Sequence, residues 1–417
     1  MRTVPSGTRS APLIDARAFE GAGAVALASA PLTMVLANRS SPLVVAVAAV
    51  LFLAASLMRS GPAATGRELA APLLRPVGLA ALAFLAWCGL SLAWSPFPAL
   101  SLRTLAEFLP TLIAAYGLTR LAPPRLPAGT AALAAGMLAV AALFTVASLA
   151  SDLAPQRALG QRAALFVLNR PVLTILLVMG PLAALLAGQG RRRLAFGLVL
   201  LGAVAILRSI SGAAAMGLIA GAAMAGLAWL LPRRLALGIA GLGLALAIIL
   251  SPVEGDLLDA LMPEAAHQRL VQSSSRARVV IARSFGAAVA ADPWRGAGYG
   301  VSARFAEVPA AQGLAPEMRA MLAVGHPHNS FLQIWAELGL VGACLASMIL
   351  ALTLRALAGL RGTAFVAGLA LLAAAAAVMA VEHGAWQGWW TAGLGLSITW
   401  LRAAWLAHRT ERTGESS

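Results

Sequence analysis

Long runs of apolar residues dominate this sequence and limit its fold more than any other feature. A helix needs roughly 20 mostly apolar residues to cross a bilayer, because each residue adds about 1.5 Å across a hydrocarbon core of about 30 Å. Hydrophobic residues make up 60% of the 417 positions and charged residues only 11%. We therefore expect an all-α fold, a polytopic transmembrane helical bundle of about twelve spans. The expected spans lie near 22–38, 42–58, 76–94, 99–118, 128–150, 171–188, 193–209, 212–231, 234–251, 329–353, 363–382 and 388–406.

The arginines predict how the chain is oriented. With the N-terminus inside, eighteen arginines fall in cytoplasmic segments and five in the short outer segments, which agrees with the positive-inside rule. This distribution predicts a multi-pass protein of a bacterial inner membrane with both termini in the cytoplasm. The net charge of +15 is spread between apolar runs and forms no single basic face, so membrane lipids are expected partners and nucleic acid is not.

One connection is much longer than the others and divides the chain. Spans one to nine are expected in 1–251, a loop domain in 252–328, spans ten to twelve in 329–406 and a cytoplasmic tail in 407–417. Within the loop, 275–291 has helical spacing of apolar residues, and 292–300 is a glycine-rich turn. We expect a folded lid with short helices on the periplasmic side, since loops of this length are usually functional or disordered.

The densest group of polar residues ends this loop and begins the tenth span. His328 precedes Asn329, Gln333 and Glu337, which recur every fourth position and would form one polar stripe on a helix. An ionisable group inside the hydrocarbon region is costly and commonly faces a wet cavity or the protein interior, so Glu337 suggests a functional site. For Asn329 and Gln333, helix-to-helix hydrogen bonding is an equally good interpretation. For His328 we favour a catalytic role.

Arginines on the outer side form a second candidate group. Arg170 begins the sixth span, Arg208 ends the seventh, and Arg276 and Arg278 begin the loop helix. A lone terminal arginine usually extends to lipid headgroups. These four, however, depart from the positive-inside trend, and guanidinium groups suit bidentate binding of a diphosphate. No cysteine or acidic spacing predicts a metal site, and we expect no cofactor.

Two weaker patterns have structural interpretations. Arg103 and Glu107 lie four residues apart within the fourth span and are expected to form a pair on one helix face. Glu382 and His383 precede a cluster of tryptophans at 386, 389 and 390, which is typical first of an interfacial aromatic belt.

Four blocks of the sequence together resemble the O-antigen ligase family, a family of membrane glycosyltransferases that shares a domain with O-antigen polymerases. They are 168–170 (Leu-Asn-Arg), 209–214 (Ser-Ile-Ser-Gly-Ala-Ala), Ser275-Arg276 leading to 292–298, and 328–333 (His-Asn-Ser-Phe-Leu-Gln) leading to 337–339. Many relatives have arginine after the second serine of the second block, where this chain has Gly212. That arginine role is therefore not transferred, and Arg170 or Arg208 would have to supply it.

The resemblance implies an inverting glycosyltransferase that moves a glycan from undecaprenyl pyrophosphate to a hydroxyl of lipid A–core on the periplasmic face. His328 would be the catalytic base, and the arginines would hold the departing diphosphate without a metal. A polymerase of the glycan and a protein O-oligosaccharyltransferase of the same superfamily are alternatives. A polysaccharide transporter ranks lower, because transporters commonly show inverted repeats and broken helices near the midplane.

Overall fold

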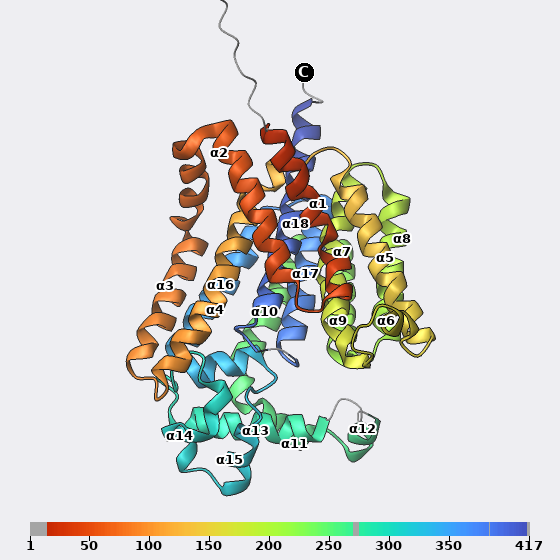
Figure 1. The fold of residues 1–417 in the computed structure, drawn as a ribbon. Coiled ribbons are helices and arrows are strands. Elements are labelled where there is room, and N and C mark those ends of the chain that lie inside the picture. Colours follow the sequence, from red (N-terminus) through yellow and green to blue (C-terminus); the bar gives the residue numbers. More distant parts are fainter. Residues whose placement is uncertain (1–14, 270–274, 383, 415–417) are drawn as a thin grey trace, which may run out of the picture.

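The computed structural model describes residues 15–269, 275–382 and 384–414, and the regular structure in these ranges is helical throughout (Figure 1). The all-helical class predicted from the sequence is therefore confirmed. Each of the twelve expected spans overlaps one long helix of a bundle. These helices are α1 (Ala16–Leu36), α2 (Ser41–Leu73), α3 (Pro76–Leu90), α4 (Pro98–Leu121), α5 (Thr130–Ala150), α7 (Asn169–Gly188), α8 (Arg192–Arg208), α9 (Gly212–Leu230), α10 (Arg233–Ile249), α16 (Ser330–Leu357), α17 (Gly362–Met379) and α18 (Gly388–Gly414).

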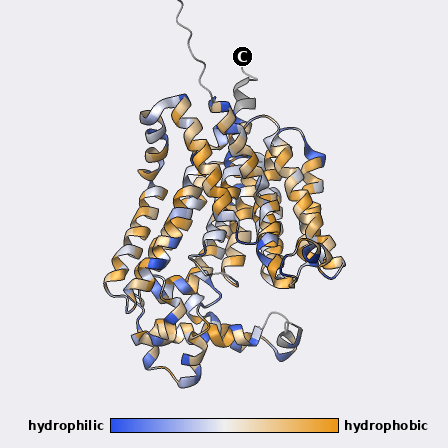
Figure 2. Ribbon diagram, in the orientation of Figure 1, coloured by the Kyte–Doolittle hydropathy of each residue, from blue (hydrophilic) through white to orange (hydrophobic). Residues whose placement is uncertain are grey.

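Eight helices in the described part of the chain are long and apolar enough to cross a membrane. They are α1, α2, α3, α5, α7, α9, α16 and α17, and a ninth arises if α10 and residues 251–261 form one span bent by 52°. Helices α8 and α10 are shorter, with 17 residues each. Apolar residues run along the whole bundle (Figure 2). The chain is thus a multi-pass membrane protein, while the number of twelve spans stays a prediction.

Helix α7 forms the centre of the bundle. Its residues from Pro171 to Met179 are all buried, because α7 packs against α5, α8, α17 and α18 on different sides. A helix that is apolar on every face is expected in such a position. Short helices connect the bundle elements: η1 (Ser91–Ala93), η2 (Pro123–Arg125), α6 (Ala154–Ala158) and η3 (Leu165–Leu168).

Helix α2 is interrupted, which explains why it is much longer than the span predicted at 42–58. Gly61 has φ 74° and ψ 168°, a conformation that glycine adopts without steric cost, and Pro62 follows it. The chain therefore reverses direction at the end of the bundle that carries both described chain ends (Figure 1).

Residues 252–328, called the lid below, cover the opposite end of the bundle (Figure 1). The lid has a core of its own, in which the buried rings of Phe285 and Phe305 lie 4.8 Å apart between centroids. Leu332 and Ala336 of α16 belong to the same core, so the lid is anchored on the first turns of α16. Its elements are η4 (Ser251–Val253), α11 (Glu254–Leu261), α12 (Glu264–Arg269), α13 (Ser275–Ala291), η6 (Ser302–Glu307), α14 (Pro309–Gln312) and α15 (Pro316–Leu322).

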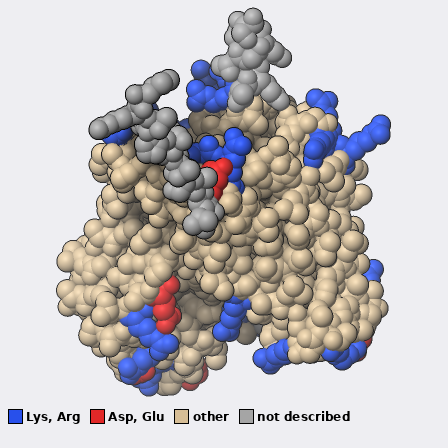
Figure 3. All heavy atoms as spheres, turned by 45° about the horizontal axis from the view of Figure 1, so that its top comes forward, with Lys and Arg blue, Asp and Glu red and all other residues tan. Residues whose placement is uncertain are grey.

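Ion pairs connect helices at the end of the bundle away from the lid. Glu20 of α1 accepts hydrogen bonds from Arg59 of α2, and Glu68 of α2 accepts from Arg125 of η2. In Figure 3, where this end comes forward, basic side chains outnumber acidic ones. Within α4, the predicted pair of Arg103 and Glu107 is confirmed, with Nε and Oε1 2.8 Å apart.

Candidate active site

Asn329 starts α16 and links it to the lid. Its side-chain oxygen accepts hydrogen bonds from the backbone N–H groups of Phe331, at 2.8 Å, and Leu332, at 3.1 Å. These are amides of the first turn that have no partner within the helix, so Asn329 is an N-cap. Its side-chain N–H₂ donates to the carboxylate of Glu254 on α11. The start of α16 is thereby fixed to the lid immediately after His328.

Glu337 is fully buried, and every one of its described partners donates to it. The carboxylate accepts from the backbone N–H groups of Gly300, at 2.6 Å, and Ser302, at 3.1 Å, and from the Ser302 hydroxyl. It also accepts from Gln333 Nε2, at 2.9 Å, and Trp386 Nε1, at 2.6 Å. Hydrogen bonds from this many donors offset the cost of removing a carboxylate from water. Glu337 therefore holds the lid, α16 and the connection before α18 together.

The helical hydrogen bonding of α16 is broken two residues after Glu337, at Gly339. This residue has φ 63° and ψ −161°, and a Cβ there would lie 2.4 Å from the carbonyl oxygen of Trp294. The glycine-rich turn of the lid packs against the break: Gly298 N donates to Glu337 O at 2.8 Å, and Leu340 N donates to Pro293 O at 2.8 Å. The backbone groups freed by the break are thus paired with the lid, as is required of irregular backbone at membrane depth.

His328 lies where the lid meets α16 and has a left-handed backbone conformation, with φ 54°. Its backbone N–H donates to His326 Nδ1 at 3.2 Å, and the two rings lie 4.1 Å apart between centroids. Nδ1 of His328 is buried and has no hydrogen-bond partner among the described residues. Glu382 lies close enough to favour the protonated ring, both through its charge and through its backbone.

Both histidines are favoured in the neutral form. Burial, followed by the positive charge of Arg278, lowers the pKa of His328, and Glu382 only partly offsets this. Burial, the neighbouring His328 and Arg278 lower the pKa of His326 to about 4. A neutral imidazole with an open nitrogen can accept a proton at neutral pH.

Glu254 is a carboxylate beside the site and was not among the predicted site residues. Burial raises its pKa to about 7, and the hydrogen bond from Asn329 offsets part of this shift. A carboxyl group with such a pKa is a feature found at functional sites. No spacing or motif distinguishes Glu254 from the other acidic residues in 254–264.

The two lid arginines have different surroundings. Arg278 donates to the backbone carbonyl of Val381 and to the Glu382 carboxylate, at 2.9 Å to Oε2, and its charge acts on His328. Arg276 donates to Glu264 and has 66% of its side chain exposed. The structure therefore brings Arg278 close to His328 and places Arg276 in an exposed ion pair.

The two bundle arginines lie on separate helices. Arg170, in the first turn of α7, has its guanidinium 5.4 Å from the ring centroid of Trp389, and its charge interacts with that of Arg39. Arg208 is exposed in the last turn of α8. The expected group of four arginines is thus distributed over α7, α8 and α13.

The connection between α17 and α18 joins these parts, and the prediction of an interfacial aromatic belt there is wrong. The tryptophans there were expected at a membrane interface, yet Trp389 and Trp390 are only 7% and 3% exposed, and Trp386 packs on Tyr299 at 4.4 Å between centroids. Ala385 N donates to Gln333 Oε1 at 2.8 Å. Residues 381–390 thereby contact the polar stripe and Arg278 on one side and Arg170 on the other.

Comparison with protein families agrees with this arrangement. Residues 196–347 match the family model described as O-antigen ligase. This part of the chain is therefore similar to an O-antigen ligase domain. The matched segment of this O-antigen ligase domain runs from α8 to α16 and contains the whole lid, His328 and the polar stripe. Arg170 and the 381–390 connection lie outside it. No curated protein matches the chain.

This similarity supports the ligase and polymerase superfamily as a whole, whose members imply glycosyltransferase-like activity on a glycan donor and a lipid acceptor. The recognition made from the four sequence blocks is therefore confirmed.

Proposed function

We propose that this protein is an inverting membrane glycosyltransferase of the O-antigen ligase type. It moves an O-antigen glycan from undecaprenyl pyrophosphate to a hydroxyl of lipid A–core at the periplasmic face of the inner membrane. The observation that carries the proposal is the position of His328 inside the matched domain: it lies where the lid meets α16, and burial and the charge of Arg278 lower its pKa and so favour the neutral ring.

In the proposed reaction, the neutral ring of His328 accepts the proton of the acceptor hydroxyl. The oxygen of that hydroxyl forms a bond to the anomeric carbon as the bond from this carbon to the diphosphate oxygen breaks. The bonding electrons leave with undecaprenyl pyrophosphate. Attack from the face opposite the diphosphate inverts the anomeric configuration. The negative charge of Glu382 stabilises the imidazolium that forms.

Arginines supply the positive charge for the leaving group in this proposal. In this structure Arg278 donates a hydrogen bond to the Glu382 carboxylate. A diphosphate carries more negative charge than a carboxylate and would compete with it for the same guanidinium. Arg170, Arg208 and Arg276 are further diphosphate-binding candidates. The Trp389 face beneath Arg170 limits the directions in which its guanidinium can turn. We propose that the reaction needs no metal, since guanidinium groups stabilise phosphate charge directly.

Polymerisation of the glycan on its carrier is the second candidate, because the matched family belongs to a superfamily that includes polymerases. Deletion of the gene followed by gel analysis of lipopolysaccharide separates the two. A ligase predicts loss of all capped species and accumulation of carrier-linked polymer. A polymerase predicts core carrying a single repeat, and an unchanged pattern would contradict both.

A further inference from the structure

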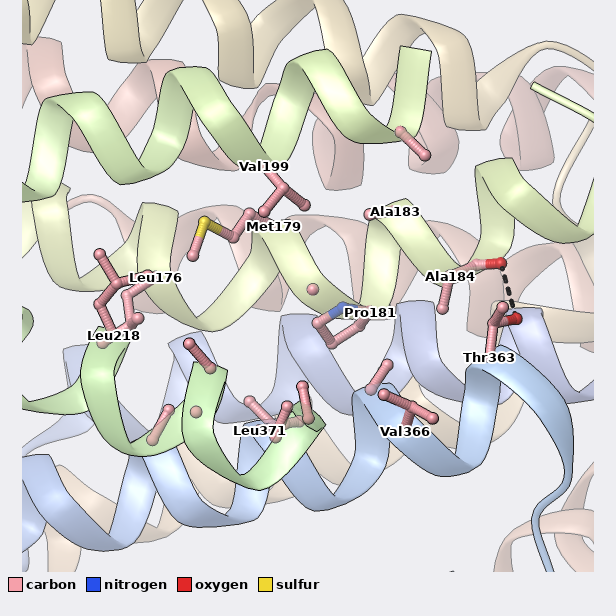
Figure 4. Close-up of a pocket in the computed structure, with 18 of the residues that line it drawn as sticks. Leu176, Met179, Pro181, Ala183, Ala184, Val199, Leu218, Thr363, Val366 and Leu371 are labelled. Carbon is pink, nitrogen blue, oxygen red and sulfur yellow. Dashed lines mark hydrogen bonds between the residues drawn. The ribbon is translucent and has the colours of Figure 1, made fainter. Parts of the chain in front are cut away.

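An apolar groove of about 570 Å³ lies between α7, α8, α9 and α17, away from the candidate active site. Figure 4 shows side chains of these helices around it, among them Met179, Val199 and Leu371. The polar group drawn there, the Thr363 hydroxyl, is turned to the carbonyl oxygen of Ala184 at 3.5 Å. The groove thus offers a surface for hydrocarbon and little for a polar ligand.

The groove extends across one leaflet of a bilayer. Its lining on α7 runs from Leu176 to Ala187, which is about 16 Å of helix. That length is close to half of the roughly 30 Å hydrocarbon core. The lining also includes Thr363 at the start of α17 and Ala195 near the start of α8. Since these helix ends lie opposite the lid, the groove occupies the leaflet away from the lid.

Arginines lie at the starts of two helices that line the groove, α8 and α17. Arg192 and Arg193 are in the first turn of α8, directly before the lining residues Ala195 and Phe196. Arg361 is the N-cap of α17, two residues before Thr363. These three arginines are exposed. Trp229, which is exposed and also lines the groove, is in the last turn of α9, a position typical of tryptophan at a membrane interface.

We propose that this groove binds an anionic phospholipid from the leaflet opposite the lid, with its acyl chains along α7 and α17 and its headgroup on Arg192, Arg193 and Arg361. The apolar lining fits the chains, and the arginines favour an anionic headgroup over a zwitterionic one. The site is independent of the proposed glycan transfer, because the proposed diphosphate-binding arginine of α7, Arg170, lies at the other end of that helix.

Native mass spectrometry of the purified chain, equilibrated with equal amounts of phosphatidylglycerol and phosphatidylcholine, tests the proposal. We expect preferential retention of phosphatidylglycerol. Each arginine near the headgroup contributes about fivefold to retention, so Arg192→Gln and Arg193→Gln should each lower it by about that factor. Arg355→Gln is the matched control, because Arg355 is an exposed arginine at the same end of the bundle on α16, which does not line the groove.

Blocking the groove tests the position of the acyl chains. Ala222 lines the groove and is exposed, so Ala222→Phe should fill it without disturbing a packed core and should remove the retained lipid. Val366→Trp on α17 is a second blocking variant. Unchanged retention in a folded blocking variant, or equal retention of both lipids by the wild-type chain, would overturn the proposal. Displacement of phosphatidylglycerol by added polyprenyl phosphate would overturn it too, since the groove would then belong to the carrier lipid.

Discussion

Replacing His328 by asparagine should lower the rate of glycan transfer by about a hundred- to ten-thousand-fold, the usual contribution of a general base. This corresponds to about 3–5 kcal/mol in the activation barrier. Asparagine is chosen because the left-handed backbone at φ 54° would cost alanine about 1 kcal/mol, whereas asparagine tolerates it. The variant retains a hydrogen-bonding side chain but cannot accept a proton.

The pH dependence of the same reaction gives a second test of His328. Because burial and Arg278 lower its pKa below the ordinary value of 6.5, the ring is mainly neutral at pH 7. The rate should therefore be flat from pH 8 to 7 and should fall only as the pH drops below 6.5, through the lowered pKa of the folded protein. A rate that already declines between pH 8 and 7 would contradict this assignment.

The assay is transfer with purified donor and acceptor in detergent, measured for wild type, His328→Asn and His326→Gln. His326 accepts the His328 backbone N–H, so its replacement should cost less than about tenfold by loosening the position of His328. Equal expression and thermal stability of the variants exclude a folding defect. A His328→Asn enzyme that retains more than a tenth of wild-type activity would refute proton transfer by this residue.

Three further predictions concern the rest of the site. Arg170→Lys and Arg276→Lys keep the charge but lose the bidentate geometry, so transfer should fall substantially at unchanged topology; normal activity of both variants would show that the diphosphate is held elsewhere. The reconstituted enzyme should work in EDTA, and restoration of a chelated sample by magnesium or manganese but not by monovalent salt would contradict a metal-free reaction. Glu337→Gln replaces one accepting oxygen by an N–H₂ group that faces other hydrogen-bond donors. Each buried donor that loses its acceptor should reduce the free energy of unfolding by about 1–3 kcal/mol. This substitution should lower the melting temperature and raise hydrogen exchange at 296–302, whereas an unchanged exchange pattern would mean that this carboxylate does not hold the lid.

Hydropathy and helical spacing were enough to predict the helices of the bundle. Each expected span overlaps a helix, because runs of this length have no other stable state in a bilayer. The stripe of Asn329, Gln333 and Glu337 was also visible, since four-residue spacing places these residues on one helix face. Sequence spacing alone did not reveal the break at Gly339, because it depends on the carbonyl of Trp294 some 45 positions earlier.

Contacts between distant segments explain what was missed at the site. Glu382 and Trp386 belong to a short connection whose composition resembles a membrane interface, and only the packing of Trp386 on Tyr299 and its bond to Glu337 show that it is internal. Glu254 looks like a solvated acidic residue until the lid folds over it and Asn329 donates to it. Long-range pairing of this kind leaves no periodic pattern in the sequence.

Reconstitution tests the central claim most directly. The purified chain is placed in liposomes with glycan on undecaprenyl pyrophosphate and with lipid A–core, and the products are separated on a gel. The account predicts glycan-capped lipid A–core from wild-type protein alone, its absence with His328→Asn, and release of undecaprenyl pyrophosphate in equal amount. Longer glycan on the carrier with uncapped lipid A–core would contradict ligation and favour polymerisation, and no product of either kind would contradict glycan transfer by this chain.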